Sequence, residues 1–167
     1  MLLSFKTELK PNNRQVTQFR QHCGVVRHAY NFGNAIILDI LKPRETDKSV
    51  KIPSAIDLHK RLIAEIKPSN PGYYKSSKAS PQQAVTEVMT AWDRCFKKVS
   101  AQPKFSKKSK SKDSFYLEQG TKAKQGIRHD VKRINLPKIG WVRLHETRSI
   151  GAVHNCVKRK FLEGIET

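Results

Sequence analysis

A long helical pattern of apolar residues constrains the fold of this 167-residue chain more than any other feature. Apolar or small side chains recur at alternating spacings of three and four residues over about seven helical turns. The positions are Val16, Phe19, Cys23, Val26, Tyr30, Gly33, Ile37 and Ile40. Gly24 lies within the pattern, so one long helix and two consecutive helices with a bend fit it equally well. Asn12 or Asn13 can cap its start, and Pro43 ends it because the residue before a proline disfavours the helical conformation.

Two further helices are predicted between residues 54 and 100. Ser54 with Asp57 resembles a capping box that opens a helix through about residue 66. Its inward-facing residues are predicted to be Ile56, Leu62, Ile63 and Ile66. Ser80 followed by Pro81 is typical of an N-cap and a first helical position, which predicts another helix ending near Ser100. The apolar stripe of that helix consists of Val85, Val88, Met89, Trp92, Phe96 and Val99.

Strands are predicted on both sides of this helical block. Residues 2–9 alternate between apolar and polar side chains, which is the period of a half-buried strand. After the helices, strands are predicted at 114–117, 127–136 and 141–144, with a weaker candidate at 152–161. Pro137 and Gly140 predict a turn between two of them, and Trp141 is interpreted as a core residue, as is Trp92.

The predicted fold class is therefore α+β. The C-terminal strands should pair with the first strand, so that the helices become an insertion into a small antiparallel β-barrel or sheet. The predicted organisation is a first strand at 1–10, a helical lobe at 11–101, a basic loop at 102–126, and the remaining strands with an irregular tail at 127–167.

Charge is the strongest indication of function. The chain has 33 Lys and Arg residues against 14 Asp and Glu residues, a formal net charge of +19. Such self-repulsion costs stability unless a polyanion neutralises it, and phosphate neutralisation releases counterions. Nucleic acid is therefore the predicted partner. An anionic membrane is less favoured because no basic amphipathic helix with a bulky apolar face is present. No membrane span, secretory signal or cysteine motif is evident, which predicts a cytoplasmic protein with reduced thiols.

Catalytic chemistry is not indicated by the residues. Asp39 falls off the apolar stripe and is interpreted as a solvated helix-face residue, and no carboxylate pair suits a two-metal nuclease. The histidines and cysteines lack metal-ligand spacing, and no phosphate-cradling glycine loop is found. The sequence predicts no catalytic residue, metal or cofactor.

Basic and aromatic residues carry the prediction of binding. Arg14, Arg20, Arg27 and His28 lie outside the apolar stripe of the first helical block. Tyr73 and Tyr74 could stack on bases or simply cover a core edge, and both interpretations stay open. The segment 104–113 holds five lysines and one acid, so it is a basic segment that phosphate would order, or a solvated linker.

Several motifs together resemble one family. These are the opening strand leading to KPNNRQ, the HCGVVRHAYNFGNAI and SPQQAVTEVMTAWDRCFKKV helices, the KFSKKSKSKDSFYLEQG segment and RINLPKIGWVRLHE. Over about residues 3–148 they look like the N-terminal half of TnpB proteins, which are transposon-encoded RNA-guided DNA nucleases related to compact type V CRISPR effectors. This region of that family is usually described as a transposase helix-turn-helix domain.

The resemblance implies a wedge-like β-barrel interrupted by a helical recognition lobe. Guide RNA, the guide–target heteroduplex and a short target-adjacent DNA motif are the implied partners, with base pairing reading the sequence. The motif-reading positions of the family would fall on Lys78, Gln82 and Gln119. The family's RuvC-like nuclease domain would follow beyond Thr167, which predicts a truncated chain without nuclease activity of its own. A separate nuclease half is a further candidate partner. A free-standing basic RNA-binding protein and a non-functional remnant of a mobile element are the alternatives.

Residues and resemblance together give one set of candidate nucleic-acid-binding positions. They are Arg14, Arg27, Tyr30, Asn31, Tyr74, Lys75, Lys78, Gln82, Lys104, Lys107, Lys108, Lys110, Gln119, Lys138 and Arg143.

Overall fold

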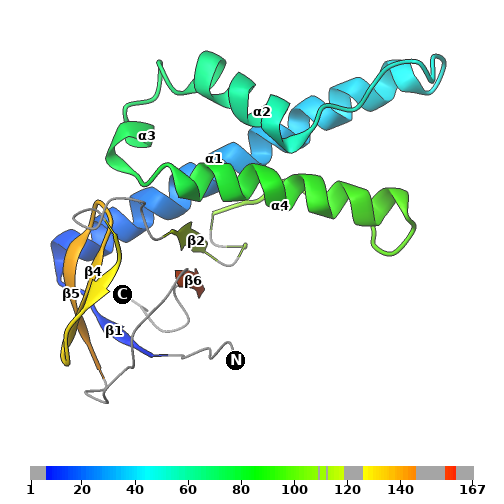
Figure 1. Cartoon of the computed structure of the whole chain (residues 1–167). Helices are drawn as coiled ribbons and strands as arrows, with labels where there is room; N and C mark the ends of the chain where they lie inside the picture. The colour runs from blue at the N-terminus through cyan, green and yellow to red at the C-terminus, as the bar shows by residue number, and fades with distance from the viewer. Residues whose placement is uncertain (1–6, 109, 112, 119–125, 146–156, 161–167) are drawn as a thin grey trace.

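The computed structural model describes residues 7–108, 110–111, 113–118 and 126–145, together with the backbone of 157–160. A block of helices follows a first strand and precedes the other strands along the chain. In Figure 1 the helices lie side by side above the strands. The predicted α+β class and the placement of the helices between strands are confirmed.

The long apolar stripe forms one helix, α1 (Asn13–Arg44), which runs through Gly24 without a break. Asn12 is its N-cap: the Asn12 Oδ1 accepts a hydrogen bond from the Gln15 N–H at 2.9 Å. The Gln15 side chain accepts one in return from the Asn12 N–H at 3.0 Å. The helix ends one residue after Pro43, at the boundary that the proline predicts.

The chain returns along α1 through α2 (Ala55–Arg61), the π-helical turn η1 (Leu62–Ile66) and α3 (Gly72–Lys75). Ser54 and Asp57 form the predicted capping box. The prediction for the inward face is confirmed for Leu62, which is buried, and for Ile66, which packs against the helical core. It was wrong for Ile56 and Ile63, which are 68% and 45% exposed, and it missed the buried Leu58, four residues before Leu62.

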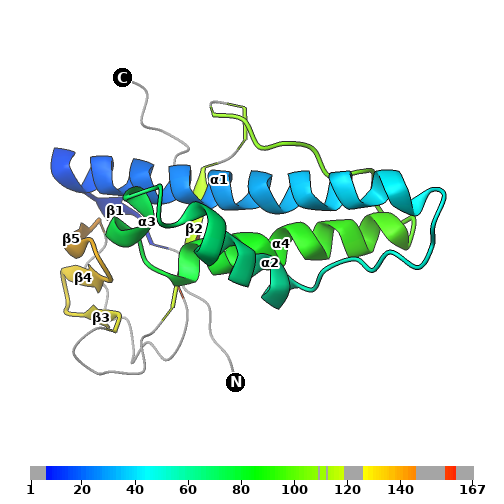
Figure 2. The ribbon, with the colours of Figure 1, turned by 90° about the horizontal axis from the view of Figure 1, so that it is seen from above.

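The last helix, α4 (Ala79–Phe96), then runs beside α1 in the same general direction (Figure 2). Trp92 is buried and its Nε1–H donates to Asn34 Oδ1 at 2.8 Å, which confirms its place in the core. Ser80 does not cap the helix: Lys78 is the N-cap, and the Ser80 hydroxyl donates to the Tyr116 carbonyl at 2.6 Å. Phe96 and Val99 are exposed, because α4 ends before the stripe does.

The strands form two antiparallel sheets. The larger has the order β1 (Leu9–Lys10), β5 (Gly140–Leu144), β4 (Arg133–Leu136), β3 (Arg128–His129). The smaller pairs β2 (Ser114–Leu117) with β6 (Val157–Lys160). The pairing of β1 with β5 makes the helices an insertion between sheet neighbours, as predicted. The described strands do not close into the predicted barrel.

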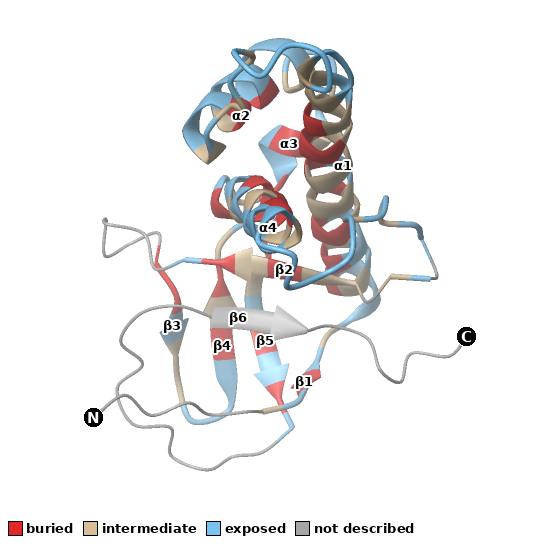
Figure 3. Cartoon of the chain, turned by 90° about the vertical axis from the view of Figure 1, so that its right-hand side faces the viewer, coloured by how far each residue is buried: buried red, intermediate tan, exposed pale blue. Residues whose placement is uncertain are grey.

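Two hydrophobic cores join these layers, as the buried residues in Figure 3 show. The first packs the inner face of the larger sheet and β2 against Phe19 and Cys23 of α1. The second lies among the helices, around Ile37, Val85 and Val88. Val26 of α1 packs against both cores, so α1 contributes side chains to each of them.

The β4–β5 hairpin follows the predicted turn with one correction. Leu136 pairs with Gly140, and Lys138 and Gly140 have positive φ values of 68° and 86°. Trp141 is not a core residue, because it is 42% exposed on the outer face of the sheet. Most of the predicted first strand, residue 119 and residue 156 lie outside the described residues.

Candidate nucleic-acid interface

The structure distributes the candidate residues over four places. On α1 lie Arg14, Arg27, Tyr30 and Asn31; at the α3–α4 junction lie Tyr74, Lys75, Lys78 and Gln82; on the following loop lie Lys104, Lys107, Lys108 and Lys110; on the hairpin lie Lys138 and Arg143. Gln119 lies outside the described residues. Arg27, Tyr30 and Asn31 of α1 come together with the loop group. Arg14 lies at the other end of α1, where Gln15 and Gln18 contact the hairpin.

The segment 104–113, which we call the lysine loop, is held against α1. The Asn31 Nδ2–H donates to the Ser106 carbonyl at 2.9 Å, and the Ser106 N–H donates to Asn31 Oδ1 at 2.7 Å. Arg27 forms an ion pair with Asp113 at the other end of the loop. Arg27 and Asn31 are therefore positioning residues in this structure, because their protein contacts hold Ser106 and Asp113 against α1. The sequence alone had suggested phosphate as the ordering partner of this segment.

The four described lysines of the loop are open to solvent. Lys104, Lys107, Lys108 and Lys110 are exposed, and none forms an ion pair within the described part of the chain. The one described carboxylate of the loop, Asp113, is already paired with Arg27. The loop therefore presents uncompensated positive charge to solvent, which suits a polyanion.

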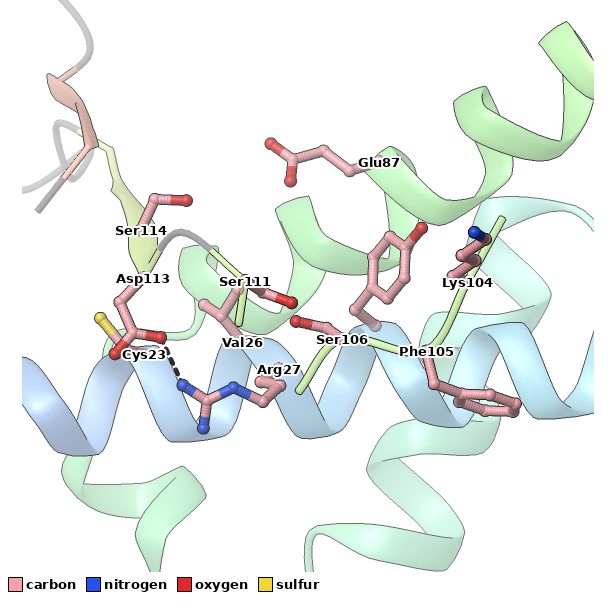
Figure 4. A pocket seen from close by; sticks show the side chains of 11 residues that line it. Cys23, Val26, Arg27, Glu87, Lys104, Phe105, Ser106, Ser111, Asp113 and Ser114 are labelled. Atoms are coloured by element: carbon pink, nitrogen blue, oxygen red, sulfur yellow. Dashed lines mark hydrogen bonds and ion pairs between the residues drawn. The ribbon is translucent and has the colours of Figure 1, made fainter. Parts of the chain in front are cut away.

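A cavity of about 290 Å³ lies between the lysine loop, α1 and α4 (Figure 4). Tyr30, Glu87 and Lys104 contribute to its lining. Burial, and then the nearby Glu87 charge, raise the pKa of Tyr30, so this side chain remains a neutral phenol at physiological pH. Burial, and then the Asp113 charge, raise the pKa of Cys23 to about 12, so its sulfur is a thiol and a poor nucleophile.

The α3–α4 junction forms a second polar surface. Lys78 and Gln82 are four residues apart at the start of α4, so they share one exposed helix face. Neither side chain has a hydrogen bond or ion pair to a described residue. Tyr74 is 57% exposed, with Lys67 Nζ lying 4.9 Å from its ring centroid, whereas Tyr73 is buried. Of the two tyrosines, Tyr73 covers the core and Tyr74 remains available for stacking.

His22 of α1 fixes this junction to the helix, and no pattern in the sequence indicates this role. Its Nδ1 lies 2.8 Å from the Gln18 carbonyl, and its Nε2 accepts a hydrogen bond from the Ser77 N–H at 3.2 Å. Accepting at Nε2 and donating at Nδ1 requires the neutral imidazole. Burial, opposed by the Gln18 hydrogen bond, lowers the pKa of His22 and favours that form.

The outer face of the larger sheet gathers further basic residues. Arg143 is exposed there, and the guanidinium of Arg133 lies 5.2 Å from the Trp141 ring centroid. Gln15 Nε2 donates to the Trp141 carbonyl at 2.8 Å, so the start of α1 holds the hairpin in place. Arg133 and Trp141 were absent from the predicted nucleic-acid-binding residues. Side chains two apart in a strand share a face, so the outward position of Arg143 could have indicated Trp141, and the pairing of the two strands could have indicated Arg133.

Two further classes of site are absent from the described part of the chain. No group of three or more His, Cys, Asp or Glu side chains is placed to hold a metal ion there. No described helix has the length and apolar character needed to cross a membrane.

Comparison with known sequences agrees with this picture. A family described as a helix-turn-helix domain matches residues 1–42. In this structure residues 13–42 form one uninterrupted helix, so a turn between two helices does not occur within them. The chain is also 28% identical over 159 residues to the Escherichia coli (strain K12) protein named "Putative RNA-guided DNA endonuclease InsQ". That match covers 92% of this chain and 36% of the relative. The chain is therefore related to the N-terminal region of the TnpB-family RNA-guided endonucleases.

Proposed function

We propose that this chain is the nucleic-acid-binding part of a TnpB-like system, holding guide RNA and target DNA without cutting DNA itself. Its relationship to an RNA-guided endonuclease supports the partner class. Because the chain spans 36% of that relative's length, the cleavage chemistry is assigned to the remaining part of such a protein or to a separate nuclease half.

The lysine loop carries the proposal. Four exposed lysines occupy a short loop that Asn31 and Arg27 hold in a fixed place on α1. A cationic segment that is already held in place loses less conformational entropy on binding than a disordered basic tail does. The phosphates of a folded RNA are the partner that this arrangement fits best, since the contact requires charge and shape but no base sequence.

The face formed by Lys78 and Gln82 is assigned to DNA. A glutamine can make paired hydrogen bonds with adenine in the major groove, and a lysine can contact guanine or a phosphate. The two side chains share one exposed face at the start of α4, and Tyr74 and Lys75 lie on the preceding helix. This face would recognise a short DNA motif, while base pairing with the guide RNA would recognise the rest of the target sequence.

A salt titration tests the RNA part. Binding of the chain to the structured RNA transcribed beside its gene should weaken linearly as log affinity against log salt concentration. Changing Lys104, Lys107, Lys108 and Lys110 together to Gln should reduce that slope by about one per lysine. The same number of substitutions at the exposed Lys42, Lys48, Lys51 and Lys60 is the matched control. Salt-insensitive binding, or none, would refute the proposal.

Two further results would change the assignment. Equal affinity for the neighbouring transcript and for unrelated structured RNA would favour a free-standing RNA-binding protein. DNA cleavage with added Mg²⁺ that disappears on replacing one particular Asp or Glu would show that the chain is an enzyme.

A further inference from the structure

The outer face of the larger sheet carries an ordered row of cations. Lys10 of β1 pairs with Arg143 of β5, and Arg143 pairs with Arg133 of β4. Three positive side chains thus stand side by side on adjacent strands, about 4.8 Å apart in the pairing direction. Like charges directly opposite each other destabilise a sheet, so this row costs stability in the free protein.

A second row beside it centres on an aromatic ring. Trp141 of β5 pairs with Asn135 of β4, which pairs with Arg128 of β3. Register partners in an antiparallel sheet share a face, so both rows lie on the same surface. Trp141 is 42% exposed on this outer face. The next residue along the strand, Val142, points to the opposite face and is buried. We call these five basic and aromatic residues, Lys10, Arg128, Arg133, Trp141 and Arg143, the outer-face cluster.

Arg133 is held in position by a carboxylate. Its Nε and Nη2 atoms donate to Asp130 Oδ2 at 3.0 and 2.9 Å, and its guanidinium lies 5.2 Å from the Trp141 ring centroid. Hydrogen bonds to Lys132 and Arg133 lower the pKa of Asp130, so it remains charged at neutral pH. Among the residues that the structure describes, Asp130 and the exposed Glu8 are the acids near this face, against four cations.

The geometry points to an unpaired RNA nucleotide as the occupant: its base stacks on Trp141, and its neighbouring phosphates contact Lys10, Arg143 and Arg133. This deepens the proposed function, on which it rests, by naming a second contact for the same RNA. An aromatic ring flanked by cations is the arrangement that binds single-stranded nucleic acid, because every base has a face that can stack. A DNA or RNA duplex keeps its bases stacked within the helix and would leave the ring uncovered.

Acrylamide quenching of tryptophan fluorescence tests the stacking in the unmodified chain. Trp92 is 2% exposed, so acrylamide should quench mainly Trp141. Single-stranded poly(U) should protect Trp141 from acrylamide, whereas heparin, a polyanion without bases, should bind and leave it accessible. Equal protection by heparin, or none by bound poly(U), would overturn the inference. Protection that grows with protein concentration in the absence of RNA would identify a second copy of the chain as the occupant and would also overturn it.

Substitutions test the contribution to affinity. Trp141→Ala should weaken poly(U) binding by about 5- to 150-fold, the value of one base–aromatic stack, and Trp141→Phe should restore most of it. Phe96→Ala removes an equally exposed ring, at 43%, and should have no effect. Arg143→Gln should lower the salt slope by about one.

The outcomes separate this inference from the proposed function. If the unmodified chain binds RNA with a steep salt dependence but Trp141→Ala binds like Phe96→Ala, the proposed function stands and the stacking site is refuted. If the unmodified chain does not bind RNA, both are refuted. Circular dichroism of Trp141→Ala, compared with the unmodified chain, should show that the variant folds, so that its loss of binding is not loss of structure.

Discussion

Gly33 of α1 and Val88 of α4 lie in such close contact that a β-carbon at position 33 would be 2.8 Å from Val88 Cγ1. Val88 is fully buried, and Leu58 packs on the same glycine from α2. Three helices therefore meet at the one position of the stripe where the side chain is absent. The helical core depends on this approach, and with it the placement of Lys78 and Gln82 at the start of α4.

Gly33→Ala should lower the free energy of unfolding by about 1–3 kcal/mol, because the added methyl group would lie 2.8 Å from Cγ1 of the buried Val88, whose β-branched side chain has one preferred rotamer in a helix. Urea unfolding followed by circular dichroism measures this. Gly24→Ala is the matched control in the same helix: nothing lies within 4 Å of a β-carbon there. It should stabilise the protein by about 0.5–1 kcal/mol, since glycine within a helix costs backbone entropy. Equal effects of the two substitutions would contradict the close packing.

Asn31→Ala should release the lysine loop, because both hydrogen bonds to Ser106 are lost. Limited trypsin digestion should then cut faster after the lysines at 104–110, while the folded core resists as before. Gln21→Ala changes an exposed residue of the same helix and should leave the cleavage rate unchanged. Unchanged cleavage in Asn31→Ala would show that other contacts hold the loop.

Stability should fall as the pH drops below about 6.5, because His22 is buried and its pKa in the folded protein is lower than its ordinary value of 6.5. The unfolded chain binds the proton first, so the contribution is complete above the ordinary pKa and is lost as the pH approaches the lowered one. Thermal unfolding from about pH 8 to about pH 5 measures it. His22→Gln should flatten this dependence. His59→Gln is the comparison variant for this pH dependence. The pKa of His59 is also lowered, first by burial and then by the charge of Lys67.

Lys78→Gln and Gln82→Ala should affect DNA binding in different ways. Loss of a lysine that contacts phosphate weakens binding to all duplexes and reduces the salt slope by about one. Loss of a glutamine that contacts adenine reduces discrimination at one base pair by about 1–3 kcal/mol. Selection from a randomised duplex library, compared between the two variants, measures both effects. Unaltered preferences in Gln82→Ala would remove this residue from motif reading.

Local chemistry made parts of this fold predictable from the sequence. Asn12 with Gln15 and Ser54 with Asp57 form capping boxes at the helix starts, and Pro137 to Gly140 form the hairpin turn. Each depends on residues within a few positions of one another, so the pattern in the sequence already contains the interaction.

The burial of individual side chains within a helical pattern, and the residue at which a helix begins, were harder to predict. Ile56 and Ile63 continue a helical period but face solvent, because α2 contacts its neighbours along the Leu58–Leu62 line. Ser80 has the chemistry of an N-cap, yet α4 begins earlier and its hydroxyl binds the Tyr116 carbonyl. In both cases a partner distant in the sequence decided the outcome, and propensity is a weak prior against such contacts.

The sequence by itself determined the helical stripe that α1 follows, the α+β class and a net positive charge that favours a polyanionic partner. These follow from periodicity, capping and composition, which are local or additive properties. The order of the elements along the chain also predicted that the first strand pairs with the later strands. Only the tertiary structure decided that Asn31 and Arg27 anchor the lysine loop and that Lys10, Arg143 and Arg133 form one row. Such groupings join residues far apart in the chain, and they depend on strand register and helix packing, which the whole fold sets at once.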